Sequence, residues 1–531
     1  MSTSIFEDTT TALGSAALSG LLAQFAAAFK QTDRLLRLHT PLGRDVLLPE
    51  TFKAIETISG AAQTDGRDML AQIPVTGYLL QIDALSTNAH LELKALIGQP
   101  VLLELLTDQS RTQLRPFHGY VTAAQCVGAN GGMARYRLTV QPWLAFLGAG
   151  RDSAVFQDQN VLQIIESIFT DYQSSLKGAG QLAPLWRLDV QDTSAYPIRS
   201  LTTQYQESDL QFINRLLLEE GLFMWFEHAG DAASPTLGSH TLVIADHNGA
   251  FKPNARSSIR FSQSKGTIED DTIDQWRAQR QWHTHAVELA SWDYRSLSNR
   301  NVGEHSATGV STSAHVPEGT PQLISQDTPG AYAYENTAQG QRLATQQLQA
   351  LSVPGHSLTA CGTTRTLAPG STFTLSGHAT ASLASAPHVV LRVLHDAKNN
   401  LSAQLNGHAQ KLAKSMPSAI DTGASSYGIN SIKRASNSPD ELFYRNAALV
   451  LPITVPYRGA GLGSHGQLIH PKPSVSGSQT ALVIGVAGQH LTTDRDHRVK
   501  VQFAWQRGQA SQSRLAHPAA DGHSGAPAVW S

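Results

Sequence analysis

Charged residues are scarce in this sequence. Asp, Glu, Lys and Arg make up 15% of its 531 residues, whereas globular proteins usually contain about 25%. The chain also contains 42 glycines and 24 prolines, which favour turns between short segments. Low charge, many turns and short apolar runs together favour a β-rich fold over long exposed helices. Because a single core does not grow to this length, we expect about three or four domains.

An excess of basic charge is also missing. The 40 Lys and Arg residues are balanced by 42 Asp and Glu residues, so the net charge is −2. The chain therefore has no basic field that would attract nucleic acid. Cysteine is nearly absent: Cys126 and Cys361 lie far apart, without C-x-x-C spacing. This excludes a disulfide framework and a thiolate metal site, and it fits folding in a reducing cytoplasm.

Common catalytic motifs are missing too. The sequence has no G-x-S-x-G, no H-E-x-x-H and no G-x-x-x-x-G-K-[ST]. A catalytic site without a sequence motif stays open, because triads assemble in space and not along the chain. We predict no catalytic, cofactor-binding or metal-binding residue, and no enzyme activity.

The longest uncharged run lies near the N-terminus, at residues 11–29. A signal peptide would carry basic residues ahead of it, but Glu7 and Asp8 precede this run. The run is rich in Ala, Gly, Ser and Thr, so we predict a helical extension. A membrane span remains an alternative by length alone.

From Arg34 onward the pattern becomes β-like. Strands are expected in 34–52, around a Pro-Gly turn, in 101–107 and in 134–143. In the last of these, Tyr136, Leu138 and Val140 alternate with polar residues, so one face should be buried and the other solvated. Residues 34–150 are therefore predicted to form a β-barrel or sandwich.

Two amphipathic helices follow, each opening with capping-box spacing. Asn160 and Gln163 begin a helix over 159–172, and Ser208 and Gln211 begin another that should stop at Gly221. Residues 222–228 then read as a strand.

The second helix is strongly acidic and could be mistaken for an acid–base site. In a helix, Asp209 and Glu220 would be separated by about 16 Å along the axis, whereas paired glycosidase carboxyls need about 5–9.5 Å. Glu207 precedes the cap and cannot pair with them directly. Glu219 and Glu220 also oppose the helix dipole at the C-terminal end. We therefore predict basic partners for them, with Arg215 as the first candidate.

Histidines offer a weaker candidate site. His283 and His285 could face one side of a strand and bind a metal, but spacing marks no third ligand. His118 and His497 are expected to be surface or packing residues.

The remainder alternates short strands and loops. Strands are expected around 275–287 and 366–377, a helix over 337–351, loops over 401–440 and a linker over 456–478. Two further strands are predicted at 481–488 and 498–505. In the second, Val499, Val501, Phe503 and Trp505 share one face.

Several stretches resemble the VgrG family of type VI secretion spike proteins, which is related to the baseplate hub and spike of contractile phage tails. Residues 117–125 and 131–169 are similar to the exit of the family's first barrel and the helix after it. The stretch 196–228 is similar to the pattern Q-Y-x-E-[ST]-D-x-x-F-x-x-R-L-L-x-x-E-G. The matching positions are Gln204, Tyr205, Glu207, Ser208, Asp209, Phe212, Arg215, Leu216, Leu217, Glu220 and Gly221.

The C-terminal region resembles the same family. Residues 479–488 and 493–507 are similar to the opening of its OB-fold neck. His497 stands where the family usually has Gly, so a looser hairpin is expected there.

The resemblance covers about residues 34–531 and implies a mainly β fold with an α/β insertion: two related β-barrels forming a phage-hub-like module, then an OB-fold neck. The domains it implies are 1–33, an N-terminal extension; 34–150, the first hub barrel; 151–275, the insertion; 276–400, the second hub barrel; 401–470, a loop-rich connection; and 471–531, the neck. The β-helix needle that normally follows is expected to be missing, whether the chain is naturally short or truncated.

The implied function is mechanical. A homotrimer would cap a tube of hexameric Hcp rings, contact baseplate components, and carry a PAAR-type tip protein and effectors through its missing C-terminal region. It would need no cofactor and bind no nucleic acid, and its only contact with a target membrane would be mechanical puncture. It would assemble in the cytoplasm without a signal peptide and then be exported. The alternatives are a baseplate hub of a phage or phage-derived particle, or a fragment of a cell-wall hydrolase spike.

Overall fold

The structure is a computed structural model of the 531-residue chain. It describes residues 29–61, 76–108, 114–129, 133–174, 182–262, 271–278, 283–291, 300–305, 333–380, 386–402, 443–461, 469–483 and 497–503, and the short pieces 319, 321, 324–328, 405, 407, 409, 493, 505 and 529–530. The predicted N-terminal helix at 11–29 and the predicted loops at 401–440 lie almost entirely outside these residues.

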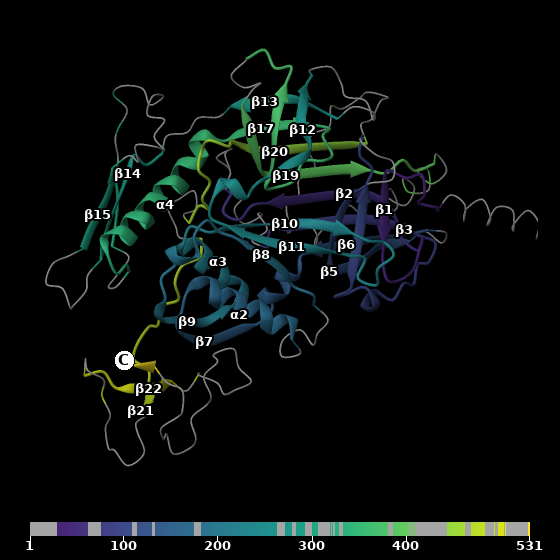
Figure 1. Ribbon diagram of the computed structural model, residues 1–531. Coiled ribbons are helices and arrows are strands. Elements are labelled where there is room, and N and C mark those ends of the chain that lie inside the picture. The colour runs from purple at the N-terminus through teal and green to yellow at the C-terminus, as the bar shows by residue number, and fades with distance from the viewer. Residues whose placement is uncertain are drawn as a thin grey trace, which may run out of the picture.

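Twelve strands form one continuous sheet that organises the molecule (Figure 1). Its first half, the N-terminal half-sheet, is antiparallel throughout. In spatial order it contains β1 (Leu36–His39), β4 (Pro100–Leu105), β5 (Arg115–Ala129), β6 (Ala134–Gln141), β3 (Tyr78–Ser86) and β2 (Leu48–Thr57).

The strand predicted at 134–143 is confirmed as β6, with Tyr136, Leu138 and Val140 fully buried. The expected solvated face is wrong in part. Arg135 and Arg137 are half-buried and ion-paired, each through two nitrogens, with Glu50 and Asp83.

The second half of the sheet closes on itself as a six-stranded barrel. Its strands are β19 (Pro387–Lys398), β18 (Ser371–Ser376), β12 (Lys252–Phe261), β13 (Thr272–Ala278), β17 (Leu358–Gly362) and β20 (Tyr444–Pro452), and β20 pairs again with β19. Seven residue pairs between β2 and β19 join this closed barrel to the N-terminal half-sheet. The two halves are thus one hydrogen-bonded unit.

The closed barrel draws its strands from three of the ranges expected from the sequence. β12 lies within 151–275 and β20 within 401–470, and both strands contribute apolar residues to the barrel core, Ile259 in the case of β12. In β20 these residues are Ala448 and Val450. The division of the chain into domains stays a prediction.

The insertion contains two further sheets and two helices. β7 (Arg151–Gln159) pairs with β9 (Arg199–Ser208), and β10 (Phe223–Gly230), β11 (Gly238–Ala245) and β8 (Leu185–Asp189) form a three-stranded sheet. Both predicted helices are confirmed as α2 (Val161–Gln173) and α3 (Asp209–Glu219), each with a complete capping box. Gly221 ends α3 with a positive φ of 70°, a conformation that favours glycine.

The β10–β11 hairpin lies between two cores. Met224 and Phe226 face the core of the N-terminal half-sheet, which also receives α2 and α3. Phe223 and Trp225 face the opposite way, against apolar residues of β19 and β20. Burial on both faces explains why residues 222–226 form an uninterrupted apolar run.

In a separate module, α4 (Thr337–His356) packs on β14 (Ala286–Ser291) and β15 (Arg300–His305), and β16 (Ile324–Asp327) extends their sheet by pairing with β14. The helix predicted at 337–351 is confirmed and runs five residues further. Short 3-10 turns lie at η2 (Leu93–Ala95), η3 (Trp143–Gly148), η5 (Thr193–Ala195) and η6 (Asn248–Ala250). Among the described residues, no helix combines the length and apolar character needed to cross a membrane.

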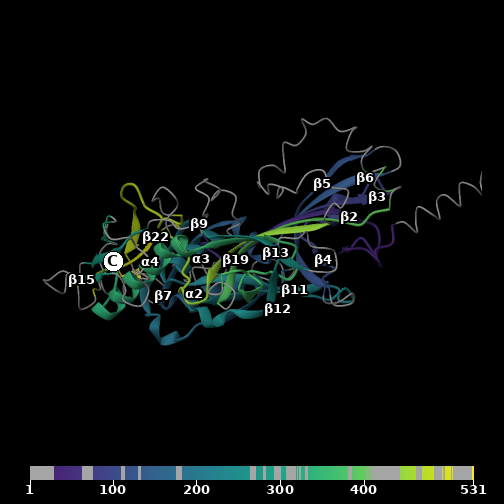
Figure 2. The ribbon, with the colours of Figure 1, turned by 90° about the horizontal axis from the view of Figure 1, so that it is seen from above.

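The C-terminal region contributes β21 (Ala481–Val483), β22 (Lys500–Phe503) and β23 (Val529–Trp530), which form a three-stranded sheet. The apolar face predicted for 498–505 is confirmed, because Val499, Val501, Phe503 and Trp505 cluster against Val155 of β7. The OB-fold assignment of this neck stays a prediction. Figure 2 shows β2, β3, β5 and β6 at one end of the molecule, and α4, β15 and β22 at the other.

Candidate functional site

The acidic stretch at 202–228 folds into β9, α3 and β10, and its carboxylates are engaged in structural contacts. Asp209 accepts hydrogen bonds from Tyr172 Oη and Gln204 Nε2, both at 2.8 Å. Tyr172 belongs to α2 and Gln204 to β9, so Asp209 links three elements. It is only 3% exposed and already uses its oxygens as acceptors.

Arg215, the predicted partner, is confirmed. Its Nη1 lies 3.1 Å from Glu219 Oε1, one helical turn further on. It also holds Glu207 through two nitrogens, with Nε–Oε1 at 2.9 Å and Nη2–Oε2 at 2.8 Å. A two-nitrogen contact of this kind fixes direction as well as distance. Arg215 therefore ties α3 to the end of β9.

Three more cations complete what we call the Arg–Glu network, and nothing in the sequence pattern marked them. Arg199 of β9 bonds Glu219 at 3.0 Å and Glu220 at 2.6 Å. Arg342 of α4 bonds Glu220 at 2.7 Å, and Lys472 lies 3.7 Å from Glu219. Because Arg199 and Arg342 come from elements 20 and 122 residues away, only the fold brings them to α3.

The electrostatics of the Arg–Glu network favour ionised groups. Burial raises the pKa of Glu219, but Lys472, Arg199 and Arg215 outweigh it, and the pKa lies below its usual range. Burial lowers the pKa of Arg199, but Glu220 and Glu219 outweigh it and raise the pKa. Carboxylates held in this way are poor proton donors at neutral pH. The arrangement suits a rigid joint between β9, α3, α4 and the segment around Lys472.

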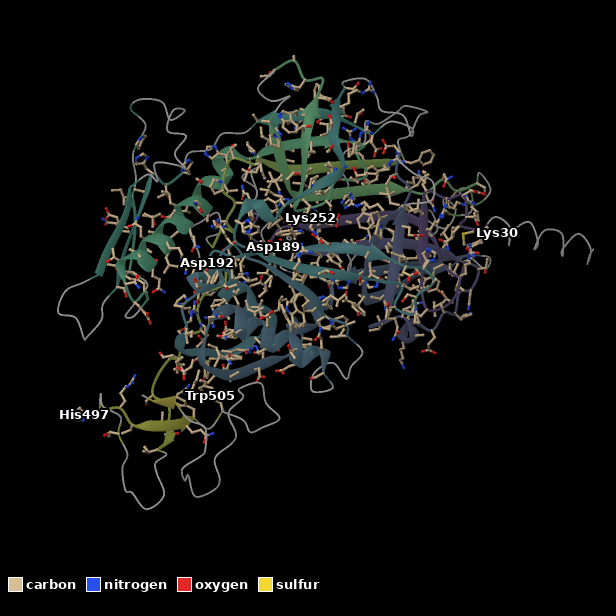
Figure 3. The ribbon with its side chains drawn as sticks, in the orientation of Figure 1. Lys30, Asp189, Asp192, Lys252, His497 and Trp505 are labelled. Carbon is tan, nitrogen blue, oxygen red and sulfur yellow. The ribbon has the colours of Figure 1, made fainter. Side chains whose placement is uncertain are left out.

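A groove of about 410 Å³ opens beside this network, between β9 and the C-terminal strands. Tyr205 of β9 meets Trp505 edge to face, with ring centroids 5.5 Å apart. Gln479 bridges the two residues, donating to Tyr205 Oη at 2.8 Å and accepting from Trp505 Nε1 at 3.1 Å. Figure 3 shows Trp505 at the boundary between the C-terminal strands and the insertion, and His497 on the far side of those strands.

The candidate histidines do not assemble a metal site in the described part of the chain. His283 and His285 precede β14 instead of sharing a strand face, and His283 Nδ1 lies 2.9 Å from the carbonyl of Thr284. No group of three or more potential ligands occurs among the described residues. His118 is buried, so it is a packing residue. His497 adopts φ +60°.

The two cysteines are free, with Cys126 exposed. Burial raises the pKa of the Cys361 thiol, which disfavours the reactive thiolate.

A closed β-barrel, continuous with a second set of strands that packs on an α/β insertion, defines a tail-hub class of protein. Residues 76–401 match the phage tail baseplate hub (GPD) family, and the chain belongs to this family.

Two type VI secretion system spike proteins of Pseudomonas aeruginosa are similar to the chain. VgrG1b is 27% identical over 485 residues, covering 90% of this chain and 54% of VgrG1b. VgrG1a is 26% identical over 482 residues, covering 90% of this chain and 61% of VgrG1a. The chain therefore spans between about half and three fifths of the length of these relatives, and the resemblance to VgrG proteins is confirmed.

A solved structure shows the same fold. The Escherichia coli c3393 protein is described as a component of the type VI secretion system with structural similarity to the T4 bacteriophage tail proteins gp27 and gp5. It superposes with a TM-score of 0.54 at 16% identity, covering 93% of this chain and 92% of that one.

Proposed function

We propose that the chain is the hub of a type VI secretion spike, which caps the inner tube and helps drive effectors through a target membrane. The observation that carries this proposal is similarity to two spike proteins along 90% of the chain. The partners we propose are two further copies of the chain, hexameric Hcp at the hub base, baseplate components, and a PAAR-type tip with effectors. We further propose assembly in the cytoplasm and export by the type VI machinery.

The fold supports a mechanical role because its parts are connected by bonds that resist shear. The β2–β19 ladder joins the closed barrel to the N-terminal half-sheet. The Arg–Glu network joins α3 to β9 and α4 through charged groups that are largely removed from water. Breaking such a pair is strongly unfavourable because it leaves a buried charge without a partner. Such contacts favour a fixed arrangement of β9, α3 and α4, as a mechanical part requires.

A secretion assay tests the proposal. In the bacterium that encodes the chain, deleting the gene should abolish release of Hcp into the medium, and re-expressing the chain within its full gene should restore it. Light scattering on the purified chain should give three times 57.1 kDa. Unchanged Hcp release in the deletion strain would contradict the function, whereas a stable monomer would contradict only assembly by this part of the protein.

A phage or phage-derived baseplate hub is the second candidate, and it also fits the family description. The two candidates differ in the particle that contains the protein. Immunoprecipitation of the chain should recover Hcp in the first case and phage tail-tube and capsid proteins in the second.

A peptidoglycan-degradation assay tests the non-enzyme assignment. Turnover that is lost on replacing particular carboxylates would overturn it.

A further inference from the structure

Two buried histidines outside the Arg–Glu network are joined directly by a hydrogen bond between their rings. His118 of β5 and His240 of β11 place their Nδ1 atoms 2.8 Å apart, and each residue is 2% exposed. They lie where the β10–β11 hairpin contacts the N-terminal half-sheet. Gly230, at the turn end of the hairpin, leaves no room for a side chain on this side: a Cβ atom at this position would lie 2.9 Å from Pro116 Cβ and 3.0 Å from Leu102 Cδ1.

The surrounding hydrogen bonds determine where the ring protons lie. Trp143 donates its backbone N–H to His240 Nε2 at 2.9 Å, so His240 carries its proton on Nδ1. His118 Nε2 faces the carbonyl of Thr236 at 2.8 Å, so His118 carries its proton on Nε2 and accepts from His240 through Nδ1. One direction of donation, Trp143 to His240 to His118 to Thr236, therefore satisfies every ring nitrogen.

This chain of bonds admits only neutral rings. A second proton on His118 would set its Nδ1–H against the Nδ1–H of His240. A second proton on His240 would set an Nε2–H against the backbone N–H of Trp143. Either protonation replaces a hydrogen bond by a repulsive contact between two donors, in a site removed from water.

Other titratable groups close to the pair do not relieve this conflict. The neighbours are Tyr78 on β3, Tyr120 on β5 and His228 on β10, with Glu56 on β2, His395 on β19 and Arg115 on β5 behind them. Glu56, the one carboxylate of this set, is engaged by Arg115 at 2.5 Å, His395 at 2.8 Å and His228 at 3.3 Å. His228 Nδ1 accepts from the backbone N–H of His118.

We propose that the His118–His240 pair is an acid-sensitive clasp, which holds the turn end of the β10–β11 hairpin to β5 when neutral and releases it when either ring is protonated. The proposal concerns the hub fold itself and does not rest on the proposed function. The segment to be released is 228–241, which carries His228, Thr236 and His240 and whose central residues 229–236 are largely exposed.

The direction of the pH effect follows from burial. Burial lowers the pKa of His118 to about 4, and burial with His118 nearby lowers the pKa of His240 well below its usual range. Once segment 228–241 is released, both His240 within it and His118 left on β5 meet water, and the pKa of each ring returns towards its ordinary value near 6.5. The clasp is therefore intact above pH 6.5 and weakens as the pH falls from 6.5 towards 4, because the released state binds more protons.

Hydrogen exchange of the whole chain, corrected for the intrinsic pH dependence of exchange, measures the clasp directly. Between pH 7.5 and pH 5.0 the opening constant of residues 228–241 should rise about 30-fold if His118 alone takes a proton, and more if His240 also does. Segments of α2 serve as an internal reference, and their opening constants should not rise in parallel with that of residues 228–241.

A matched set of variants separates the clasp from other histidines. Glutamine at both positions can accept through its carbonyl and donate through its amide without titrating, so His118→Gln/His240→Gln should remove the pH dependence at 228–241. His90→Gln, at an exposed site, should keep it. Wild-type exchange at 228–241 that does not change with pH would overturn the proposal, even if the double variant failed to fold. A folded double variant with unchanged pH dependence would also overturn it.

Discussion

Arg342 reaches from α4 to Glu220 at the end of α3, with Nη2 2.7 Å from Oε2. Glu220 is 3% exposed and receives Arg199 on its other oxygen at 2.6 Å. A carboxylate at the C-terminal end of a helix is unfavourable beside the helix dipole. Here two guanidinium groups from different elements compensate for that position. The contact also connects the α4 module to the insertion.

Replacing Arg342 by methionine should loosen this connection. Methionine keeps the apolar stem but removes one charged hydrogen bond to a buried carboxylate, so we expect the free energy of unfolding to fall by about 1.5–3 kcal/mol. Urea denaturation measures the loss, and hydrogen exchange should place it in α4 and α3.

Arg187→Met is the matched control for this prediction. The Arg187–Glu227 pair is about one third exposed on both side chains, so the loss should be below about 1 kcal/mol. Equal losses in the two variants would show that the Arg342–Glu220 contact contributes no more than a surface ion pair.

Replacing Trp505 by alanine should detach the C-terminal strands from β9. The change removes the edge-to-face contact with Tyr205 and the hydrogen bond that Trp505 Nε1–H donates to Gln479 Oε1. An aromatic pair contributes about 0.5–1.5 kcal/mol beyond its buried area, so exchange at β22 should become at least about twofold faster. Ile97→Ala, at an exposed site away from this contact, should leave exchange at β22 unchanged. If β22 exchanged equally in all three proteins, docking through Trp505 would be excluded.

Local features of the fold could be predicted from the sequence because they depend on neighbouring residues. The capping boxes at Asn160 and Ser208 and the stop at Gly221 need only residues within one turn. The partner Arg215 was predicted for Glu219 because it lies one turn away on the same helix. The structure confirms each of these local predictions.

Long-range relations could not be predicted in this way. Glu220 is held by Arg342, which is 122 residues away, and β20 closes a barrel with strands from β12 onward. The bond between His118 and His240 also joins residues 122 positions apart. No periodicity links such positions, because their contact depends on sheet order and not on local pattern.

We expect His388 to give the closed barrel its own pH dependence. It is 1% exposed in β19 and packs against Trp276, with ring centroids 5.0 Å apart. Burial lowers its pKa to about 4, so the unfolded chain binds the extra proton first. The stability this group contributes is present above pH 6.5 and is lost as the pH falls towards 4.

The His388→Leu variant tests this contribution. Wild-type stability should fall between pH 8 and pH 5 by about 2 kcal/mol more than that of the variant. Comparing the two pH values in each protein cancels any packing change caused by leucine. Urea titrations at both pH values measure the difference. If wild type and variant lost the same stability between pH 8 and pH 5, His388 would not be buried in its neutral form.

His497 occupies a left-handed turn at φ +60°, between the bridged residues Thr493 and Val499. The sequence resemblance predicted a looser hairpin there because glycine usually fills this position. At His497 itself the backbone has a glycine-like positive φ, and histidine is among the residues that tolerate it better than most. The strain should therefore be small but measurable. The looser hairpin stays a prediction, because residues 494–496 lie outside the described part of the chain.

Two substitutions at this position should act in opposite directions. His497→Gly relieves the side-chain strain but increases the freedom of the unfolded chain, so a net gain of only about 0.5 kcal/mol is expected. His497→Val places a β-branched side chain at positive φ and should destabilise the hairpin by more than about 1 kcal/mol. Hydrogen exchange at β22 reports both effects, since Val499 and β22 follow this turn. Equal exchange for glycine and valine would show that the turn does not hold the left-handed conformation in solution.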